Sequence, residues 1–564
     1  MYIYNAIDQS IVDARVRQFA DQTERYLSGR ISEDEFKPLR LQNGVYVERH
    51  SPLLRVAIPY GLLSSRQLRM LAQIGRKYDR GFGHFTTRQN IQFNWVKLEQ
   101  VHEILADLAS VQMHAIQTSG SCIRNVTTDH LAGVAHDERV DPRPLAELMR
   151  QWSTLNPEFA FLPRKFKVAY NGAVEDRAAS EVHDLAFDVY RDEAGEVRLT
   201  VKVGGGQGRT PRVAPVIKTG LHWRDMLSYT EAVLRTYNRW GRRDNIYKAR
   251  IKILVDALGP ERFGEEVEQE FAHLQGGPAT LAASELERMT AFFGAPAYHS
   301  ATTGDQDEAR HRLADPRFNA WVKRNVAKHK RDAYGAVTIS LKPLGIAPGD
   351  ATSDQMDAVA DLADRFSFGQ IRVSHHQNLV LADVARSELW TLYQALETLG
   401  LSEPNVGLAT DIICCPGGDY CALANAKSIP VAAAVQETLA AKAQDIGTLA
   451  IKMSGCINAC GHHHVGHIGI LGVDKKDEEW YQILIGGRTD TRTALGQIVG
   501  KAIPREAVAP TIERMTNFYL ENRTSGELFI DAVERLGKTA FHDAAFQSDT
   551  SPTSPSPQIQ EANS

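Results

Sequence analysis

Four cysteines in the last third of the chain form two closely spaced pairs. Cys415 and Cys421 lie in the segment CCPGGDYC, and Cys456 and Cys460 lie in SGCINACG. Four thiolates are the ligand set of a [4Fe-4S] cluster, so the two pairs together predict one cluster of this kind. The whole chain contains only six cysteines. This concentration favours a cluster over disulfides, which are typical of small, cysteine-rich, exported domains.

A structural zinc site is an alternative use of the second cysteine pair. His462, His463, His464 and His467 follow Cys460 closely, and mixed cysteine and histidine sets bind zinc. Their spacing does not match that of common zinc fingers. The alternation of the apolar residues around them predicts a strand that carries histidines on both faces. We therefore expect these histidines to pack or to line a pocket. In a third interpretation the chain carries electrons through a cluster and has no catalytic site.

A basic segment in the cysteine-poor half of the chain indicates an anion site. In LPRKFKVAY, strand alternation places Lys165 and Lys167 on one face, roughly 6 to 7 Å apart. Two neighbouring ammonium groups repel each other unless an anion or water lies between them, and on a surface water alone satisfies them. An anion pocket is the better interpretation if Arg55 and Arg124 converge on the same place. Such a pocket would argue against a protein that only carries electrons.

The segment FTTRQNIQF supplies further polar side chains. Strand alternation places Arg88 and Gln92 on one face and Ile91 and Phe93 on the other. A polar face that begins with arginine suits an anionic ligand. For Arg88 taken alone, a solvated strand face is the simpler interpretation.

The same segment belongs to an internal repeat. FTTRQNIQF at residues 85–93 resembles RVSHHQNLVL at residues 372–381. An apolar strand and a helix precede each copy, and Ser64 or Ser65 is a candidate cap for the first helix. Apolar residues recur at helical spacing in both predicted helices: Leu68, Leu71, Ile74 and Tyr78 in the first, and Met356, Val359, Leu362 and Phe366 in the second.

The repeat continues beyond these segments, since LPRKFKVAY and VKVGGGQGR in the first half correspond to IKMSGCINACG and QILIGGR in the second. Strand, helix, strand, helix is half of a ferredoxin-like unit. We therefore predict an α+β fold of two pseudo-symmetric halves, each a ferredoxin-like half-domain followed by a larger α/β module. The expected divisions are an N-terminal extension (1–45), a first half-domain (46–115), a first module (116–280), a linker (281–332), a second half-domain (333–400), a second module (401–546) and a disordered tail (547–564).

Composition excludes several classes of partner. The chain has 64 Lys and Arg against 69 Asp and Glu, a net charge of −5, so we expect no nucleic acid partner. The N-terminal segment lacks the basic and apolar regions of an export signal, and we expect no membrane span. No glycine-rich dinucleotide fingerprint stands between a strand and a helix. These features predict a cytoplasmic protein that receives electrons from a separate donor.

Taken together, the motifs resemble the sulfite and nitrite reductase hemoprotein family, over about residues 45 to 540. Its cluster pattern, C-x5-C followed by C-x3-C, matches both cysteine pairs. The resemblance implies sirohaem and a [4Fe-4S] cluster as cofactors. By the same resemblance Cys460 bridges the cluster to the sirohaem iron, and Cys415, Cys421 and Cys456 hold the other irons.

The resemblance also assigns the remaining site residues. In the family, the substrate anion is held by two arginines and two lysines, which correspond to Arg55, Arg124, Lys165 and Lys167 in this chain. Positions that contact the macrocycle carboxylates or frame the pocket correspond to Arg88, Gln92 and Arg164. Many members carry another arginine four residues before Arg88, where this chain has His84.

A short sequence segment distinguishes the sulfite reductases of the family from the nitrite reductases. Nitrite reductases that share L-P-R-K usually carry asparagine at the position of Lys167, whereas sulfite reductases keep both lysines. KFK therefore favours sulfite, whose higher charge suits a second ammonium group. The resemblance implies a six-electron reduction of sulfite to sulfide in assimilatory sulfur metabolism, with a flavoprotein reductase or a ferredoxin as electron donor. Reduction of nitrite to ammonia is the alternative on the same scaffold.

Overall fold

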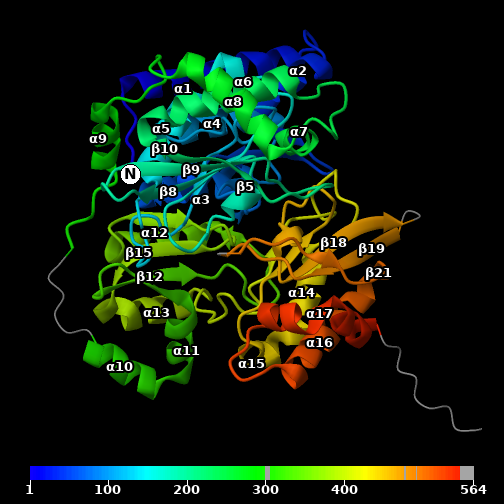
Figure 1. The fold of residues 1–564 in the computed structure, drawn as a ribbon. Coiled ribbons are helices and arrows are strands. Elements are labelled where there is room, and N and C mark those ends of the chain that lie inside the picture. The colour runs from blue at the N-terminus through cyan, green and yellow to red at the C-terminus, as the bar shows by residue number, and fades with distance from the viewer. Residues whose placement is uncertain (299–304, 476–477, 491, 547–564) are drawn as a thin grey trace, which may run out of the picture.

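A computed structural model describes residues 1–298, 305–475, 478–490 and 492–546. The predicted disordered tail lies outside these residues. Figure 1 shows the first half of the chain at the top, the second half-domain beneath it, and the second larger module, in yellow to red, on the right. Helices and strands are both present throughout, and the two halves repeat the same element order. The predicted α+β fold with two related halves is therefore confirmed.

The first half-domain contains the predicted strand, helix, strand and helix. Helix α3 begins directly after Ser64, whose side chain accepts the backbone N–H of Gln67 while Gln67 bonds back to the Ser64 backbone. This reciprocal cap fixes where the helix starts. The apolar stripe of α3 is buried, as its spacing predicts. The elements are β1 (Val45–Val47), β2 (Pro52–Val56), β3 (Leu62–Ser64), α3 (Ser65–Tyr78), β4 (Phe82–Phe85), β5 (Ile91–Phe93) and α4 (Val101–Ser110).

The second half-domain repeats this order and exchanges edge strands with the first. Strand β13 of the second half pairs with β4 of the first, and β3 of the first pairs with β14 of the second. Helices α3 and α12 lie against each other, and their apolar faces join one hydrophobic core. The two half-domains therefore form one platform. Its second set of elements is β11 (Val326–Lys328), β12 (Tyr334–Ile339), β13 (Asp350–Thr352), α12 (Ser353–Phe366), β14 (Gln370–Val373), β15 (Leu379–Ala385) and α13 (Leu389–Thr398).

One glutamine in each copy links its half-domain to the following module through hydrogen bonds of its side-chain amide. Gln89 and Gln377 occupy equivalent turns and have positive φ angles of 55° and 60°. Gln89 bonds through its amide to both backbone groups of Thr128, and Gln377 bonds in the same way to Cys414. Each glutamine also donates to a carbonyl of the opposite half. Arg88 lies in the first of these turns, before β5, so the prediction that it belongs to the strand was wrong.

The two larger modules contain sheets of the same topology. In each sheet the first three strands run parallel and the next two are antiparallel. The lysines of LPRKFKVAY lie just before β7, and the cysteines of SGCINACG lie just after the equivalent strand β17. The strands are β6 (Thr127–Thr128), β7 (Val168–Asn171), β8 (Leu185–Arg191), β9 (Val197–Val203) and β10 (Val216–His222), then β16 (Ile413–Cys414), β17 (Ile451–Ser454), β18 (Ile468–Lys475), β19 (Glu478–Ile485), β20 (Gln497–Ile498) and β21 (Ile503–Pro504).

The remaining helices pack against the sheets or against other helices (Figure 1). None of the helices in the described ranges is long and apolar enough to cross a membrane. They are α1 (Ala6–Leu27), α2 (Glu33–Gln42), α5 (Arg143–Ser153), α6 (Met226–Trp240), α7 (Ile251–Leu258), α8 (Pro260–Leu274), α9 (Ala283–Phe292), α10 (Asp305–Ala314), α11 (Pro316–Asn325), α14 (Ile429–Leu439), α15 (Ala443–Ile446), α16 (Arg505–Asn522) and α17 (Phe529–Phe546).

Candidate active site

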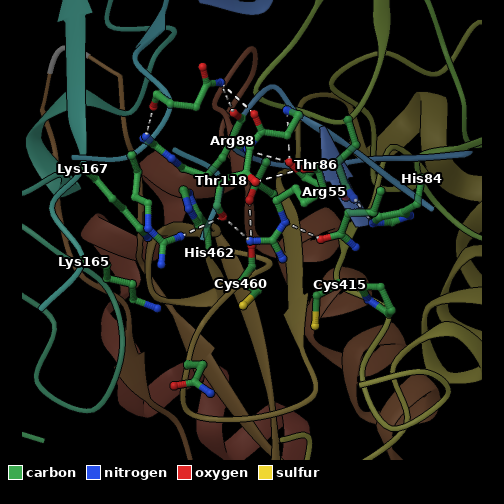
Figure 2. Close-up of a pocket in the computed structure, with 18 of the residues that line it drawn as sticks. Arg55, His84, Thr86, Arg88, Thr118, Lys165, Lys167, Cys415, Cys460 and His462 are labelled. Atoms are coloured by element: carbon green, nitrogen blue, oxygen red, sulfur yellow. Dashed lines mark hydrogen bonds between the residues drawn. The ribbon is translucent and has the colours of Figure 1, made fainter. Parts of the chain in front are cut away.

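Two adjoining cavities lie where the first half-domain meets the two larger modules. One cavity, of about 110 Å³, is lined by the basic residues of the first half and is called the cation cavity. The other, of about 170 Å³, is called the cysteine cavity because all four paired cysteines line it. Several residues line both cavities, among them Arg55, Gln92, Arg124, Lys165, Cys415 and Cys460. Figure 2 shows the cation cavity, with the Cys460 thiol beside the basic side chains.

Five basic side chains line the cation cavity. Arg55 comes from β2, Arg88 from the turn before β5, Arg124 from the loop before β6, and Lys165 and Lys167 from the segment before β7. The convergence of Arg55 and Arg124 with the two lysines, on which the anion pocket depends, is therefore present in the structure. Such a concentration of positive charge within one cavity attracts a small anion.

The arginines are held in place by neutral acceptors. Arg55 donates from Nε to the side-chain oxygen of Gln92 at 2.9 Å. Arg124 donates to the backbone carbonyls of Gly120 and Thr118 at 2.7 to 3.0 Å. These bonds fix the guanidinium groups but leave their charge uncompensated. The charge therefore remains available to a bound anion.

The two lysines project from an irregular segment that enters β7. Phe166 lies between them and is fully buried, so Lys165 and Lys167 turn to the opposite side, toward the cavity. Burial, together with the neighbouring Arg124, lowers the pKa of Lys165 to about 8. Burial and the adjacent Lys165 lower the pKa of Lys167 well below its usual value. A bound anion opposes both effects in part, because it favours the charged form of each lysine.

A buried carboxylate, which the sequence did not reveal, supports this group of cations. Asp184 is 0% exposed and accepts two bonds from the Arg250 guanidinium, at 2.9 and 2.6 Å. Its other oxygen accepts the backbone N–H of Lys167 at 2.9 Å. Asp184 thus partly balances the charge and also positions the lysine segment. Nothing in the local spacing of the sequence distinguishes it from an ordinary residue at the start of a strand.

Tyr46 is a second residue that sequence reasoning missed. It lines the cysteine cavity, and the Arg55 guanidinium lies 5.0 Å from the centre of its ring. Burial alone would raise the pKa of the phenol, but the charges of Arg124 and Arg55 lower it to about 8. The phenol is therefore a group that can hold or release a proton beside the anion site.

The four paired cysteines surround the second cavity. Cys415 follows β16, while Cys456 and Cys460 follow β17, so the parallel pairing of these strands brings the two motifs together. Burial raises the pKa of Cys415 and of Cys421 to about 12. Their thiols therefore release protons only when a metal binds. A cavity lined by four cysteines fits a [4Fe-4S] cluster.

Cys460 lines both cavities, as a residue joining a cluster to a second group must. The hydroxyl of Thr87 donates to the Cys460 carbonyl at 2.7 Å and fixes its loop against the first half-domain. Among the described residues, no group of three or more Cys, His, Asp and Glu side chains is placed to hold a single metal ion. His463 to Val465 form a short 3-10 turn, and β18 begins only at Ile468, so the predicted strand of histidines was wrong.

Of the remaining residues considered in the sequence analysis, Arg88 and His84 line the cation cavity and Arg164 does not. Arg88 lines the cation cavity and donates to Thr127 and to the Asn125 carbonyl. Arg164 is half-buried and lines neither of the two cavities. His84, where the resemblance implies an arginine in many members, lines the cation cavity and lies 2.7 Å from Asp350 of the exchanged strand β13.

Comparison with known proteins agrees with this geometry. The nitrite and sulphite reductase 4Fe-4S domain matches residues 119–274 and 410–550. The nitrite/sulfite reductase ferredoxin-like half domain matches residues 50–111 and 330–399. These two pairs of matches follow the internal repeat, and together they contain most of the residues that line the two cavities.

Some relatives are named as sulfite reductases and others as nitrite reductases. A sulfite reductase [ferredoxin] of Mycolicibacterium paratuberculosis is 28% identical over 93% of this chain and 89% of its own. A ferredoxin–nitrite reductase of Synechococcus elongatus is 28% identical over 79% of this chain and 81% of its own. The solved structure of the Mycobacterium tuberculosis NirA protein superposes with a TM-score of 0.75 at 25% identity, covering 91% of this chain and 92% of that one. The chain therefore belongs to the nitrite and sulfite reductase family, oxidoreductases that carry sirohaem and a [4Fe-4S] cluster.

Proposed function

We propose that the protein is a sulfite reductase hemoprotein that catalyses the six-electron reduction of sulfite to sulfide. The observation that carries the proposal is the meeting of Lys165, Lys167, Arg55 and Arg124 with Cys460 around one cavity. Sulfite offers three acceptor oxygens and up to two negative charges, which suits two ammonium and two guanidinium groups. Nitrite has a single charge, and its reduction to ammonia is the alternative, since several similar relatives are named for it.

Each part of the site has a separate task in this proposal. The sirohaem and the cluster supply the redox chemistry, with electrons arriving one at a time. Arg55 and Arg124 bind and orient the anion, because their neutral partners leave their charge available. Lys165 and Lys167 stabilise negative charge on the departing oxygens and donate protons to them, and their lowered pKa makes them better acids. Three oxygens leave as water over the complete reduction.

Replacing Lys167 with asparagine tests the choice of substrate. We expect kcat/KM for sulfite to fall by about 10²-fold or more, because a charged hydrogen-bond donor to the reacting anion is lost. The loss for nitrite should be smaller, since nitrite has one charge and fewer oxygens. Both values are measured with reduced methyl viologen as electron donor. Equal losses for the two anions would contradict a specific role of the second lysine in sulfite preference.

The pH dependence of anion binding tests the charge on Lys165. A lysine whose pKa is about 8 is charged below that pH and neutral above it. We therefore expect KM for nitrite to rise by about tenfold between pH 7 and pH 9. Nitrite is the suitable probe because its own charge stays constant over this range. A Lys165→Arg variant keeps its charge throughout, so its KM should stay flat, and an equally steep rise there would assign the effect to another group.

The electron donor is a separate protein in this proposal. The relatives from M. paratuberculosis and S. elongatus are named as ferredoxin enzymes, which makes a ferredoxin the first donor to test and a flavoprotein reductase the second. Rates with each donor at saturating sulfite decide between them. A cytoplasmic location is part of the same proposal.

A further inference from the structure

Lys452 is a buried cation that is not among the residues lining the two cavities described above. It lies on β17, is 2% exposed, and belongs to the module that carries the cysteines. Within the described ranges its ammonium group forms no ion pair with a carboxylate. Burial and the nearby Lys342 lower its pKa to about 8, and the Asp176 carboxylate, which forms no ion pair with it, partly opposes this shift. A buried ammonium group without a carboxylate in direct contact costs free energy, so its position favours an anionic partner.

Two buried histidines with free ring nitrogens lie close to this lysine. His375 follows β14 in the second half-domain, and His462 follows Cys460 and lines the cation cavity. Their ring centres are 5.0 Å apart, and Lys452 acts on both rings electrostatically. Neither ring nitrogen of His375, nor Nδ1 of His462, has a hydrogen-bond partner in the part of the chain that the structure describes.

A third ring, His183, completes the group and limits what can bind there. Its centre lies 6.2 Å from that of His375 and 6.5 Å from that of His462. Its Nδ1 donates to the Ala179 carbonyl at 2.8 Å, so in the neutral ring the other nitrogen is an acceptor. That nitrogen has no partner in the described ranges either. His183 can therefore orient a neighbouring imidazole by accepting its N–H.

The charges around this group select an anion as the ligand. Arg88, Lys167 and Lys452 all act on His462, and no carboxylate is among the groups that shift its pKa most. Unsatisfied buried donors beside a positive charge fit a carboxylate, which accepts several hydrogen bonds at once. The group borders the cation cavity through His462. A ligand in that cavity can therefore extend a carboxylate between the rings.

We propose that Lys452, His375 and His462 bind one carboxylate side chain of the sirohaem. This inference rests on sirohaem lying in the cation cavity. Lys452 supplies the charge, the two imidazoles supply N–H donors, and His183 is a positioning residue. The three binding residues come from β17, from the turn after β14 and from the cysteine loop, so the macrocycle would tie the second half-domain to the second module.

Retention of sirohaem by a Lys452→Met variant tests the inference. Methionine keeps the length of the side chain and removes the charge, so one charge-assisted bond to the carboxylate is lost. We expect sirohaem absorbance to leave the protein about tenfold faster on dialysis, relative to cluster iron. The cofactor-free variant should have an unchanged or higher thermal midpoint, because a buried unpaired charge has been removed. A structural lysine would lower that midpoint and leave sirohaem retention unchanged, which would overturn the inference.

Lys342→Met is the matched control. Lys342 is also buried, but its ammonium group lies 2.6 Å from the Asp411 carboxylate. Its replacement should lower the thermal midpoint and leave the rate of sirohaem loss unchanged. Equal rates of sirohaem loss in the two variants would count against a specific carboxylate site.

A second variant keeps the test decisive if Lys452→Met folds poorly. His375→Leu should also speed sirohaem loss, whereas His375→Gln, which keeps an N–H donor, should restore part of the retention. Equal loss in both histidine variants, or full retention in both, would overturn the inference. Unchanged protein that contains cluster but no sirohaem would contradict the proposed function itself, so the two failures are distinguishable.

Discussion

Replacement of Cys460 by serine should abolish sulfite and nitrite turnover together, to below about a thousandth of the activity of the unchanged protein. Cys460 lines both cavities, as Cys415 does, and in the cation cavity it lies with the two lysines and two arginines proposed to bind the anion. A serine hydroxyl is a much poorer ligand for iron than a thiolate, so the link between cluster and sirohaem should be lost. The measurements are turnover with reduced methyl viologen, iron and labile sulfide content, and the visible spectrum of the sirohaem.

Two other cysteines provide matched controls for this variant. Cys122 is half-buried and donates its thiol to the Ser119 carbonyl, a bond that serine can also form. Cys414 is buried beside a predicted ligand, and its thiol donates to the Cys415 carbonyl. Serine at either position should leave a cluster in place and most of the turnover intact. Sulfite reduction retained in Cys460→Ser would refute the proposed junction.

The cysteine pairs and the internal repeat could be recognised in the sequence because each is a local pattern. The spacing within CCPGGDYC and SGCINACG specifies ligands directly, and the apolar stripes of α3 and α12 follow helical periodicity. The internal repeat aligns LPRKFKVAY with the cysteine motif SGCINACG. In the structure the equivalent strands β7 and β17 adjoin these two segments. Local patterns of this kind can be recognised in a sequence without knowledge of the fold.

The parts that could not be predicted depend on contacts between distant segments. The exchange of β3 and β13 joins strands that are far apart in the chain, and no periodicity encodes the choice of partner. Asp184 and Lys452 are each single charged residues whose burial becomes visible only after the sheets have formed. Arg88 was assigned to the wrong element because alternation continues through the turn before β5. Its predicted place in a polar pocket does not depend on that error.

Asp184→Asn should be the most destabilising of the single substitutions considered. Asparagine keeps an oxygen that accepts the Lys167 N–H, so the substitution removes charge with little change of shape. Arg250 then loses its partner at 2.6 Å, and its charge adds to that of Lys165 and Lys167. Leaving a buried charge unpaired costs about 3 to 5 kcal/mol. We expect a lower thermal midpoint of the cofactor-free protein and, because the lysine segment shifts, weaker anion binding in the loaded enzyme.

A second substitution separates the charge effect from a loss of packing. In the double variant Asp184→Asn with Arg250→Met, the unpaired cation is absent, and methionine fills much of the space of the arginine stem. We expect more than half of the lost stability to return, which would give a coupling energy between the two positions. Additive losses in the double variant would mean that Asp184 stabilises the module through its hydrogen bonds alone. A recovered thermal midpoint with anion binding still weak would show that the charge pair, as well as the fold, is needed to hold Lys165 and Lys167 at the cavity.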